Sequence, residues 1–227
     1  MTTAKITYRF LFFDGRTVEQ DVILDGDTGR QVSGPVRSHR VWAQLEYKKC
    51  KLCPLKKEEH PECPVAKNLA VVGDTFKSKK SFERVVVYVE TPERTYRKEV
   101  QLQEGLSSLI GLIMATSDCP MMEFLRPMAR FHLPFSSLKE TAIRSVSFYL
   151  LKQYFIAKNG GKPDYDLADL QKRYTAIEGV NLAMADRIRS MSDADAEANS
   201  IVILDTFAQI LSNRLSNKLP DLDKLFE

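Results

Sequence analysis

Residues 84–115 read RVVVYVETPERTYRKEVQLQEGLSSLIGLIMA, and the spacing of the apolar residues changes within this stretch. The β-branched run over 84–90 favours a strand, and the alternating residues of 94–102 make that segment its hairpin partner across a short turn. From about residue 106 the apolar spacing becomes 3.6, which predicts a buried helix over 106–115. The stretch therefore marks the point where a strand-forming part of the chain gives way to a helical part.

The segments before this stretch predict another hairpin. Residues 5–13 alternate in the manner of a half-buried strand, with aromatic and aliphatic side chains on one face. Asp14-Gly15 follows, and this dipeptide is a strong signal for a two-residue hairpin turn. Residues 16–24 then alternate back, so we expect the two segments to pair as antiparallel strands.

Shorter elements are expected between the two hairpins. Residues 26–38 are rich in Gly, Ser, Asp and Arg, a composition typical of a loop. Val41–Tyr47 predicts a short third strand that leads directly into Cys50. After a cysteine-bearing loop over 48–64, the apolar spacing predicts a helix over Pro64–Phe76.

From residue 106 onward the helical periodicity continues. Ser137 and Glu140 match a capping box, and Gly160-Gly161 is typical of the end of the helix that this box opens. Four further helices are predicted, over 120–130, from Ser137 through Lys158, from Asp164 or Asp166 through Ile188, and from Ser192 or Asp193 through Leu215.

Strands first and helices second is the pattern of an α+β protein. We expect residues 1–104 to form an antiparallel sheet of hairpins with the cysteine-bearing loop and one helix. Residues 105–227 are expected to form a helical bundle. A chain of 227 residues buries enough surface for a sound core without covalent staples, so the two parts are expected to pack as one unit.

The composition excludes several classes of protein. The chain is 44% hydrophobic and 28% charged, with a net charge of +3, which argues against a dedicated nucleic-acid binder. It has no run of about 18 apolar residues and no signal-peptide core, so we expect a cytoplasmic protein without a membrane span. Structural disulfides are rare in that compartment, and clustered cysteines there favour metal binding.

Four cysteines carry the clearest chemical signal. Three of them and a histidine form the set Cys50-x2-Cys53-x6-His60-x2-Cys63, and the fourth is the distant Cys119. Zinc or a [4Fe–4S] cluster is held by four thiolates, and zinc also by three thiolates and an imidazole. The spacing therefore predicts a metal site with Cys50, Cys53 and Cys63 as ligands, completed by Cys119 or by His60.

Two alternatives to a metal site stay open. The cysteines are free buried thiols in one alternative, and a redox-active or structural disulfide in the other. Charge does not separate zinc from iron–sulfur, because both four-thiolate sites carry a net charge of −2. The lysines around Cys50 and Cys53 offset either site, and three nearby glutamates dilute this basic run.

Proline follows three of the four cysteines, and the proline predicts local structure. Proline is favoured in the first turn of a helix, so Pro64 and Pro120 are expected to open the helices 64–76 and 120–130. Cys63 and Cys119 would then lie at two helix N-termini, where free N–H groups stabilise a thiolate. The position of Cys119 decides whether all four cysteines form one site.

The remaining residues give three hypotheses about function. His132 is either a core histidine or a second-shell partner of the metal site. The chain contains no glycine-rich phosphate loop, Gly-x-Ser-x-Gly or His-Glu-x-x-His motif, so an enzyme is not favoured. The leading hypothesis is a metal-binding protein without catalysis. The alternatives are an iron–sulfur redox enzyme or sensor and a metal-free interaction domain.

Several longer motifs carry a resemblance to a known family. They lie at residues 50–55, 60–69, 90–96, 115–120 and 126–135, and they include the segment RPMARFHLPF. With these motifs the chain resembles an uncharacterised bacterial domain-of-unknown-function family over nearly its whole length. In that family a proline tends to follow the first cysteine, where this chain has Lys51. This departure leaves the sulfur ligands intact, and the resemblance implies one family unit without a mechanism.

Overall fold

The two predicted hairpins form one antiparallel sheet with the strand order β2-β1-β3-β4. The computed structural model describes residues 2–32, 41–76, 79–190, 195–217 and 222–225. The strands are β1 (Thr3–Phe12), β2 (Thr17–Asp25), β3 (Arg84–Glu90) and β4 (Thr95–Gln101). Phe10 of β1 lies opposite Val18 of β2 and Val87 of β3. The alternation seen in the sequence therefore gives the sheet one buried face.

Among the described residues one α-helix lies between β2 and β3 in the chain and the others follow β4, and four of the predicted helices are confirmed. The helices are α1 (Pro64–Phe76), α2 (Leu102–Thr116), α3 (Arg126–Arg130), α4 (Leu138–Lys158), α5 (Ala168–Arg189) and α6 (Asp195–Ser216). Short 3-10 helices are η1 (Val41–Ala43), η2 (Glu123–Leu125) and η3 (Asp223–Leu225). The predictions for α1, α2, α4 and α5 hold, whereas the predicted start of α6 at Ser192 or Asp193 lies outside the described residues.

The ends of α4 and α5 follow the expected chemistry. Ser137 and Glu140 form the predicted capping box, with the Ser137 hydroxyl accepting from the Glu140 N–H and the Glu140 side chain accepting from the Ser137 N–H. At α5 the Asp164 carboxylate accepts from the N–H groups of Ala168 and Asp169. Of the two predicted capping residues, Asp164 is therefore the one that satisfies free N–H groups at the start of this helix.

The predicted third strand, Val41–Tyr47, is wrong. This segment forms η1 and a series of turns, and it touches an extended segment through the isolated antiparallel bridge of Gln44 with Glu62. The physical reason is a contact from α5. The buried Arg187 takes the carbonyl oxygens of this segment as hydrogen-bond acceptors, so they are not offered to a sheet.

The predicted helix from Pro120 to Arg130 is also wrong. The chain makes turns from Pro120, then forms η2, and only the short helix α3 follows. Pro127 explains the interruption, because it has no N–H to bond with the carbonyl of Glu123 one turn earlier. Proline is tolerated in the first turn of a helix, and α3 begins one residue before it.

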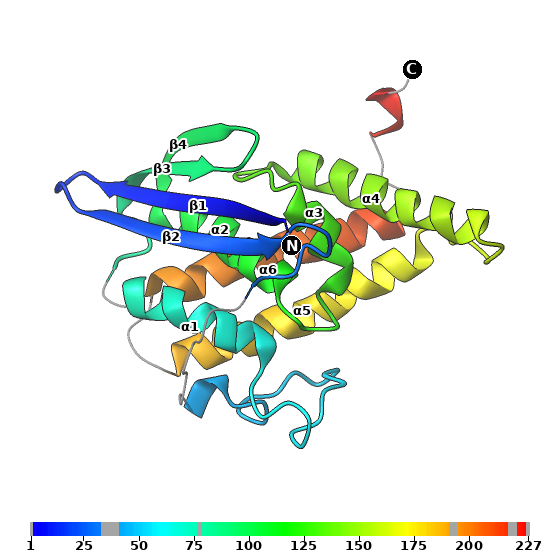
Figure 1. Cartoon of the computed structure of the whole chain (residues 1–227), viewed down its shortest axis with the longest axis horizontal. Helices are drawn as coiled ribbons and strands as arrows, with labels where there is room; N and C mark the ends of the chain where they lie inside the picture. The colour runs from blue at the N-terminus through cyan, green and yellow to red at the C-terminus, as the bar shows by residue number, and fades with distance from the viewer. Residues whose placement is uncertain (1, 33–40, 77–78, 191–194, 218–221, 226–227) are drawn as a thin grey trace.

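The sheet and the helices share one hydrophobic core. Buried side chains of β1, β3, α1, α2, α5 and α6 belong to a single cluster. In Figure 1 the sheet lies in front of α2 and α6, and α4 and α5 extend to the other side of the view. The fold is α+β, as predicted, while the proposed boundary between residues 104 and 105 stays a prediction. No helix within the described ranges is long and apolar enough to cross a membrane.

Candidate functional site

The cysteine-bearing loop is attached to the C-terminal end of α5 by Arg187. Its guanidinium donates from Nη1 to the carbonyl oxygens of Trp42 and Gln44, the latter at 2.8 Å, and from Nη2 to that of Leu45 at 2.9 Å. The side chain is buried, with 1% of its surface exposed. Nearby, the Lys48 ammonium donates to the carbonyl of Asp186 at 2.7 Å. These contacts fix the backbone that leads into Cys50.

Backbone pairing brings the two ends of the loop together. The Leu45 N–H donates to the Pro61 carbonyl at 2.9 Å, and the Cys63 N–H donates to the Ala43 carbonyl at 2.8 Å. Between these ends, the Cys53 N–H donates to the Cys50 carbonyl at 3.0 Å and closes a tight turn. Cys50 and Cys53 are half-buried and pack against the core. The loop therefore presents the first three cysteines from one folded segment.

Cys63 occupies the helix start that its proline predicts. Its carbonyl accepts from the Lys67 N–H at 2.9 Å, and α1 begins at Pro64. The side chain is 7% exposed. The thiol therefore stands at the N-terminus of a long helix, where free N–H groups favour negative charge.

Cys119 lies in the turn that follows α2 and not at an α-helix start. Its N–H faces the Ser117 hydroxyl at 3.4 Å, and its side chain is 7% exposed. The backbone N–H groups of Met121 and Met122 lower the pKa of the thiol, although burial has a larger opposite effect. The expected second helix N-terminus is thus replaced by two turn N–H groups.

A cavity of about 520 Å³ lies between the loop and the Cys119 turn. Pro64 and His60 line it from the loop side, and Pro120 lines it from the other side. The prolines that follow Cys63 and Cys119 therefore border the same space. The fold brings the Cys119 segment to the loop although the two are far apart in the sequence.

The thiols also act on one another electrostatically. The pKa of Cys119 is raised to about 12, mainly by burial and to a smaller extent by Cys63 and Cys50. Burial likewise raises the pKa of Cys50 to about 11, with additional contributions from Cys63 and Cys53, while the Arg187 charge opposes the rise. Such mutual effects require short separations. All four cysteines therefore belong to one neighbourhood.

The thiols are not already arranged as a complete metal site. All four cysteines are free. Within the described ranges, no group of three or more His, Cys, Asp or Glu side chains has an arrangement that could hold a metal ion. The ligand set of Cys50, Cys53, Cys63 and either Cys119 or His60 stays a prediction.

Arg187 is the residue at this site that the sequence does not reveal. Its Nε is buried without a hydrogen-bond partner, and the described part of the chain shows no ion pair to its guanidinium. In the sequence it stands between Asp186 and Arg189 at a helix end, a position typical of an exposed basic residue. Its burial results from contacts with a segment more than a hundred residues earlier, which leave no local signal.

The two candidate histidines, His60 and His132, lie in different places. His60 is exposed and borders the cavity beside the loop. His132 is half-buried, and its Nε2 shares a hydrogen bond of 2.5 Å with the Tyr8 hydroxyl on β1. Enclosure of the ring and the nearby Arg144 charge lower the pKa of His132 to about 3. His132 lines a separate apolar cavity, and its second-shell role stays a prediction.

Fold and site together define an α+β protein in which cysteines from a loop and from a distant turn share one partly buried neighbourhood. The chain belongs to the family described as domain of unknown function (DUF6901), which matches residues 6–227. The match covers the sheet, the cysteines and the helices, in agreement with the expected family unit. Neither a curated protein nor a solved structure matches the chain.

Proposed function

We propose that the protein binds zinc or an iron–sulfur cluster through Cys50, Cys53, Cys63 and Cys119. The supporting observation is the position of Cys119, whose turn borders the same cavity as the loop. The mutual effects of the thiols on their pKa values agree with this placement. Cys119 would be the one ligand outside the loop, and the metal would then join the loop to the helical part.

The buried charge of Arg187 supports an anionic site. A guanidinium removed from water is costly unless a negative charge lies nearby. The neutral carbonyl groups around Arg187 satisfy its Nη atoms but not its charge, and its Nε has no partner. Four thiolates around Zn²⁺ or around a [4Fe–4S]²⁺ cluster carry a net charge of −2. A metal–thiolate group beside Cys50 would supply the missing negative charge.

The raised pKa values of the thiols fit a site whose thiols lose their protons when a metal binds. Metal binding releases the thiol protons, because the thiolate is the ligand. Burial that disfavours an isolated thiolate therefore keeps the thiols protonated in the metal-free site, and metal binding has to displace these protons. Cys50 and Cys53 are the more exposed pair and lie in a turn, so they can move toward the buried Cys63 and Cys119. A reducing cytoplasm, where we place the protein, keeps the thiols available.

Metal analysis after anaerobic purification tests the proposal. We expect about one zinc or one iron–sulfur cluster per chain, with visible absorption distinguishing the cluster from zinc. Cys119→Ser should lose the metal, and His60→Ala is the matched control that should retain it. The reverse pattern would assign the fourth ligand to His60. A metal-free wild-type protein that takes up neither zinc nor a reconstituted cluster would overturn the proposal and favour an interaction domain.

A further inference from the structure

A second cavity, of about 440 Å³, lies among the five helices α2 to α6 and the segment that connects α3 to α4, with η2 and β4 also contributing to its lining. Its lining shares no residue with the cavity beside the cysteine loop. The volume is within the range of about 300–1,000 Å³ that is usual for small-molecule sites. This cavity is therefore a separate candidate for ligand binding.

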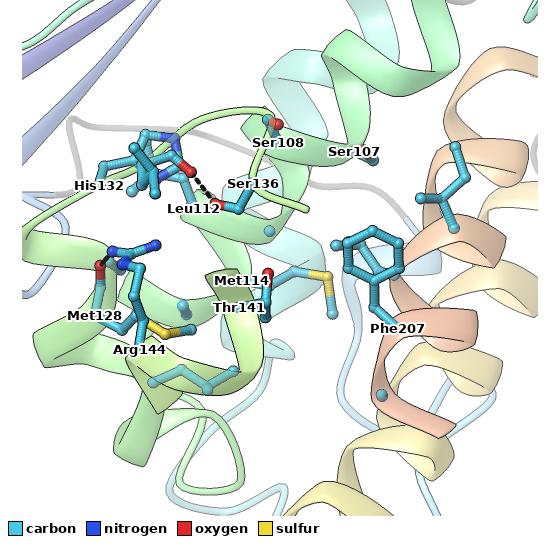
Figure 2. Close-up of a pocket in the computed structure, with 18 of the residues that line it drawn as sticks. Ser107, Ser108, Leu112, Met114, Met128, His132, Ser136, Thr141, Arg144 and Phe207 are labelled. Carbon is cyan, nitrogen blue, oxygen red and sulfur yellow. Dashed lines mark hydrogen bonds between the residues drawn. The ribbon is translucent and has the colours of Figure 1, made fainter. Parts of the chain in front are cut away.

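One side of the cavity is apolar. Leu112 and Met114 of α2 line it together with Leu204, Phe207 and Leu211 of α6. Figure 2 shows Phe207 on the α6 side, with Met114 between it and the polar side chains on the opposite side. Aliphatic, aromatic and thioether groups of this kind accommodate a hydrocarbon group and adapt to its shape. A tail of several methylene groups suits this side.

The other side carries polar side chains, most of which are already engaged. The Ser108 hydroxyl accepts from the Phe135 N–H at 2.9 Å, and the Ser136 hydroxyl donates to the Leu133 carbonyl at 2.5 Å. His132 is bonded to a tyrosine on the sheet. Figure 2 places Ser108, Ser136 and His132 on the same side of the cavity as Arg144.

On this side of the cavity, two cationic side chains can donate further hydrogen bonds to a ligand. Arg144 donates from Nη2 to the carbonyl oxygens of Met128 and Phe131, at 2.8 and 2.6 Å, and these bonds leave its Nη1 and Nε for another acceptor. Lys98 also lines the cavity, with its ammonium 5.8 Å from the centre of the Phe135 ring. Both groups are donors without acceptor capacity, so they select a ligand that accepts hydrogen bonds.

Two carboxylates, Glu140 and Glu104, affect the ligand charge that this cavity favours. The N–H and hydroxyl of Ser137 in the capping box bind the Glu140 carboxylate and lower its pKa most, and the charges of Arg144 and Lys98 lower it further. Glu104 lines the cavity but is exposed to solvent. Lys98 is exposed as well, so the half-buried Arg144 is the cation that remains at the enclosed polar end.

Two buried polar atoms without hydrogen-bond partners lie on α5 and α6. Asn181 of α5 lines the cavity and has a buried Nδ2 without a partner, and Asp205 of α6 has a buried Oδ1 without one. Thr175 and Ser212 share a hydrogen bond of 3.1 Å between the same two helices. Asn181 follows Thr175 by six residues on α5, and Asp205 precedes Ser212 by seven residues on α6. The unmet donor and the unmet acceptor thus lie on two helices that pack against each other.

We propose that this cavity binds an amphipathic carboxylic acid, with the carboxylate at Arg144 and Lys98 and the hydrocarbon tail between α2 and α6. Both Nη2 hydrogens of Arg144 are engaged, so a carboxylate would accept a hydrogen bond from Nη1 or from Nε, and in this position it would also neutralise a half-buried charge. The tail would fill a space whose lining otherwise lacks contact partners. The proposal is independent of the cysteine site.

Decanoate, titrated into the purified full-length protein by calorimetry, tests the headgroup and the tail together. We expect decanoate to bind in a one-to-one ratio and decanol and protonated decylamine to bind at least about tenfold more weakly. Decanol binding as tightly as decanoate would overturn the assignment of an acid. A preference for decylamine, or no binding of decanoate, would overturn it as well.

Variants separate the two ends of the site. Arg144→Met is expected to weaken decanoate binding at least about tenfold without weakening decanol, whereas Lys152→Met, an exposed control on α4, should change neither. If Arg144→Met does not fold, Lys98→Met removes the exposed cation instead and should weaken decanoate severalfold. Ala208→Phe places a ring in the cavity and should abolish the binding of every ligand. Unchanged decanoate affinity in the folded Ala208→Phe variant would place the ligand elsewhere and overturn the proposal.

Discussion

Arg187 Nη2 donates a hydrogen bond of 2.9 Å to the carbonyl oxygen of Leu45, which lies 142 residues earlier in the chain. The same guanidinium reaches the carbonyls of Trp42 and Gln44. One side chain therefore takes the place of a neighbouring strand, because it donates hydrogen bonds to the backbone carbonyls of a buried segment. This arrangement directs the chain into Cys50 and sets the position of the whole cysteine loop.

Arg187→Met is expected to destabilise the protein. The change leaves the carbonyls of Trp42 and Leu45 without their donor, whereas that of Gln44 still accepts from the Tyr47 N–H, and each unmet buried group costs about 1–3 kcal/mol. Because water can enter after the loss, we expect the free energy of unfolding to fall by roughly 3 kcal/mol in urea titrations. Arg189→Met, in the exposed last turn of the same helix, is the control and should stay within about 0.5 kcal/mol of wild type. Equal effects of the two variants would contradict the role assigned to Arg187.

The Tyr8–His132 pair predicts a dependence of stability on pH. The folded pKa of His132 is lowered to about 3, from an ordinary value of 6.5, by enclosure of its ring and by the Arg144 charge. Between about pH 3 and pH 6.5, His132 therefore binds a proton in the unfolded chain but not in the folded chain. This contribution is fully present above about pH 6.5 and is lost as the pH falls toward 3.

The slope of this loss can be measured. One proton changes the free energy of unfolding by at most about 1.4 kcal/mol per pH unit, and the partial exposure of His132 makes this an upper bound. Urea titrations from about pH 7 to about pH 4 should show a steeper decline for wild type than for His132→Gln. His60→Gln, at an exposed position, should follow the wild-type slope. Parallel curves for wild type and His132→Gln would rule out this proton as the source.

Two glycines inside helices should respond in opposite directions to alanine. A Cβ atom at Gly105 of α2 would lie 2.9 Å from Val87 Cγ2 and 3.0 Å from Phe10 Cε1, both on the sheet. Gly105→Ala should therefore destabilise by about 1–3 kcal/mol, since the helix and the sheet must separate. Gly179→Ala meets nothing within 4 Å in α5 and should stabilise by up to about 1 kcal/mol. Thermal unfolding of both variants measures this contrast, and stabilisation by Gly105→Ala would contradict the close packing of α2 on the sheet.

Local pattern was sufficient for most of the fold. The hairpins and the helices α1, α2, α4 and α5 follow from period, turn residues and caps, which act over a few residues. The two wrong elements have different causes. Val41–Tyr47 has a strand-like composition, but Arg187 takes its carbonyls, and a contact across 142 residues has no local signature. Pro127 is visible in the sequence of 120–130, and the backbone hydrogen bond that it cannot donate breaks the helix that the apolar spacing of that segment predicts.

The candidate site was likewise predictable only where its residues are close together in the sequence. The spacing of Cys50, Cys53 and Cys63 was readable because the three lie in one loop. Whether Cys119 joins them depends on how the end of α2 packs beside α1, which only the fold determines. The apolar cavity was not predicted at all, because its lining comes from five helices and a connecting segment whose apolar residues look like ordinary core positions.

Metal binding by the four cysteines should appear as stability. A ligand that binds only the folded state raises the free energy of unfolding by about 4 kcal/mol at a thousandfold excess over its dissociation constant. Chelation should therefore lower the unfolding midpoint of the wild-type protein, and restoring the metal should recover it. Cys119→Ser should show the chelated midpoint under both conditions, because a serine hydroxyl does not replace a thiolate, whereas His60→Ala should respond as wild type does. If chelation shifts the midpoint of Cys119→Ser as much as that of the wild-type protein, Cys119 is not a ligand, and the metal belongs to the loop alone.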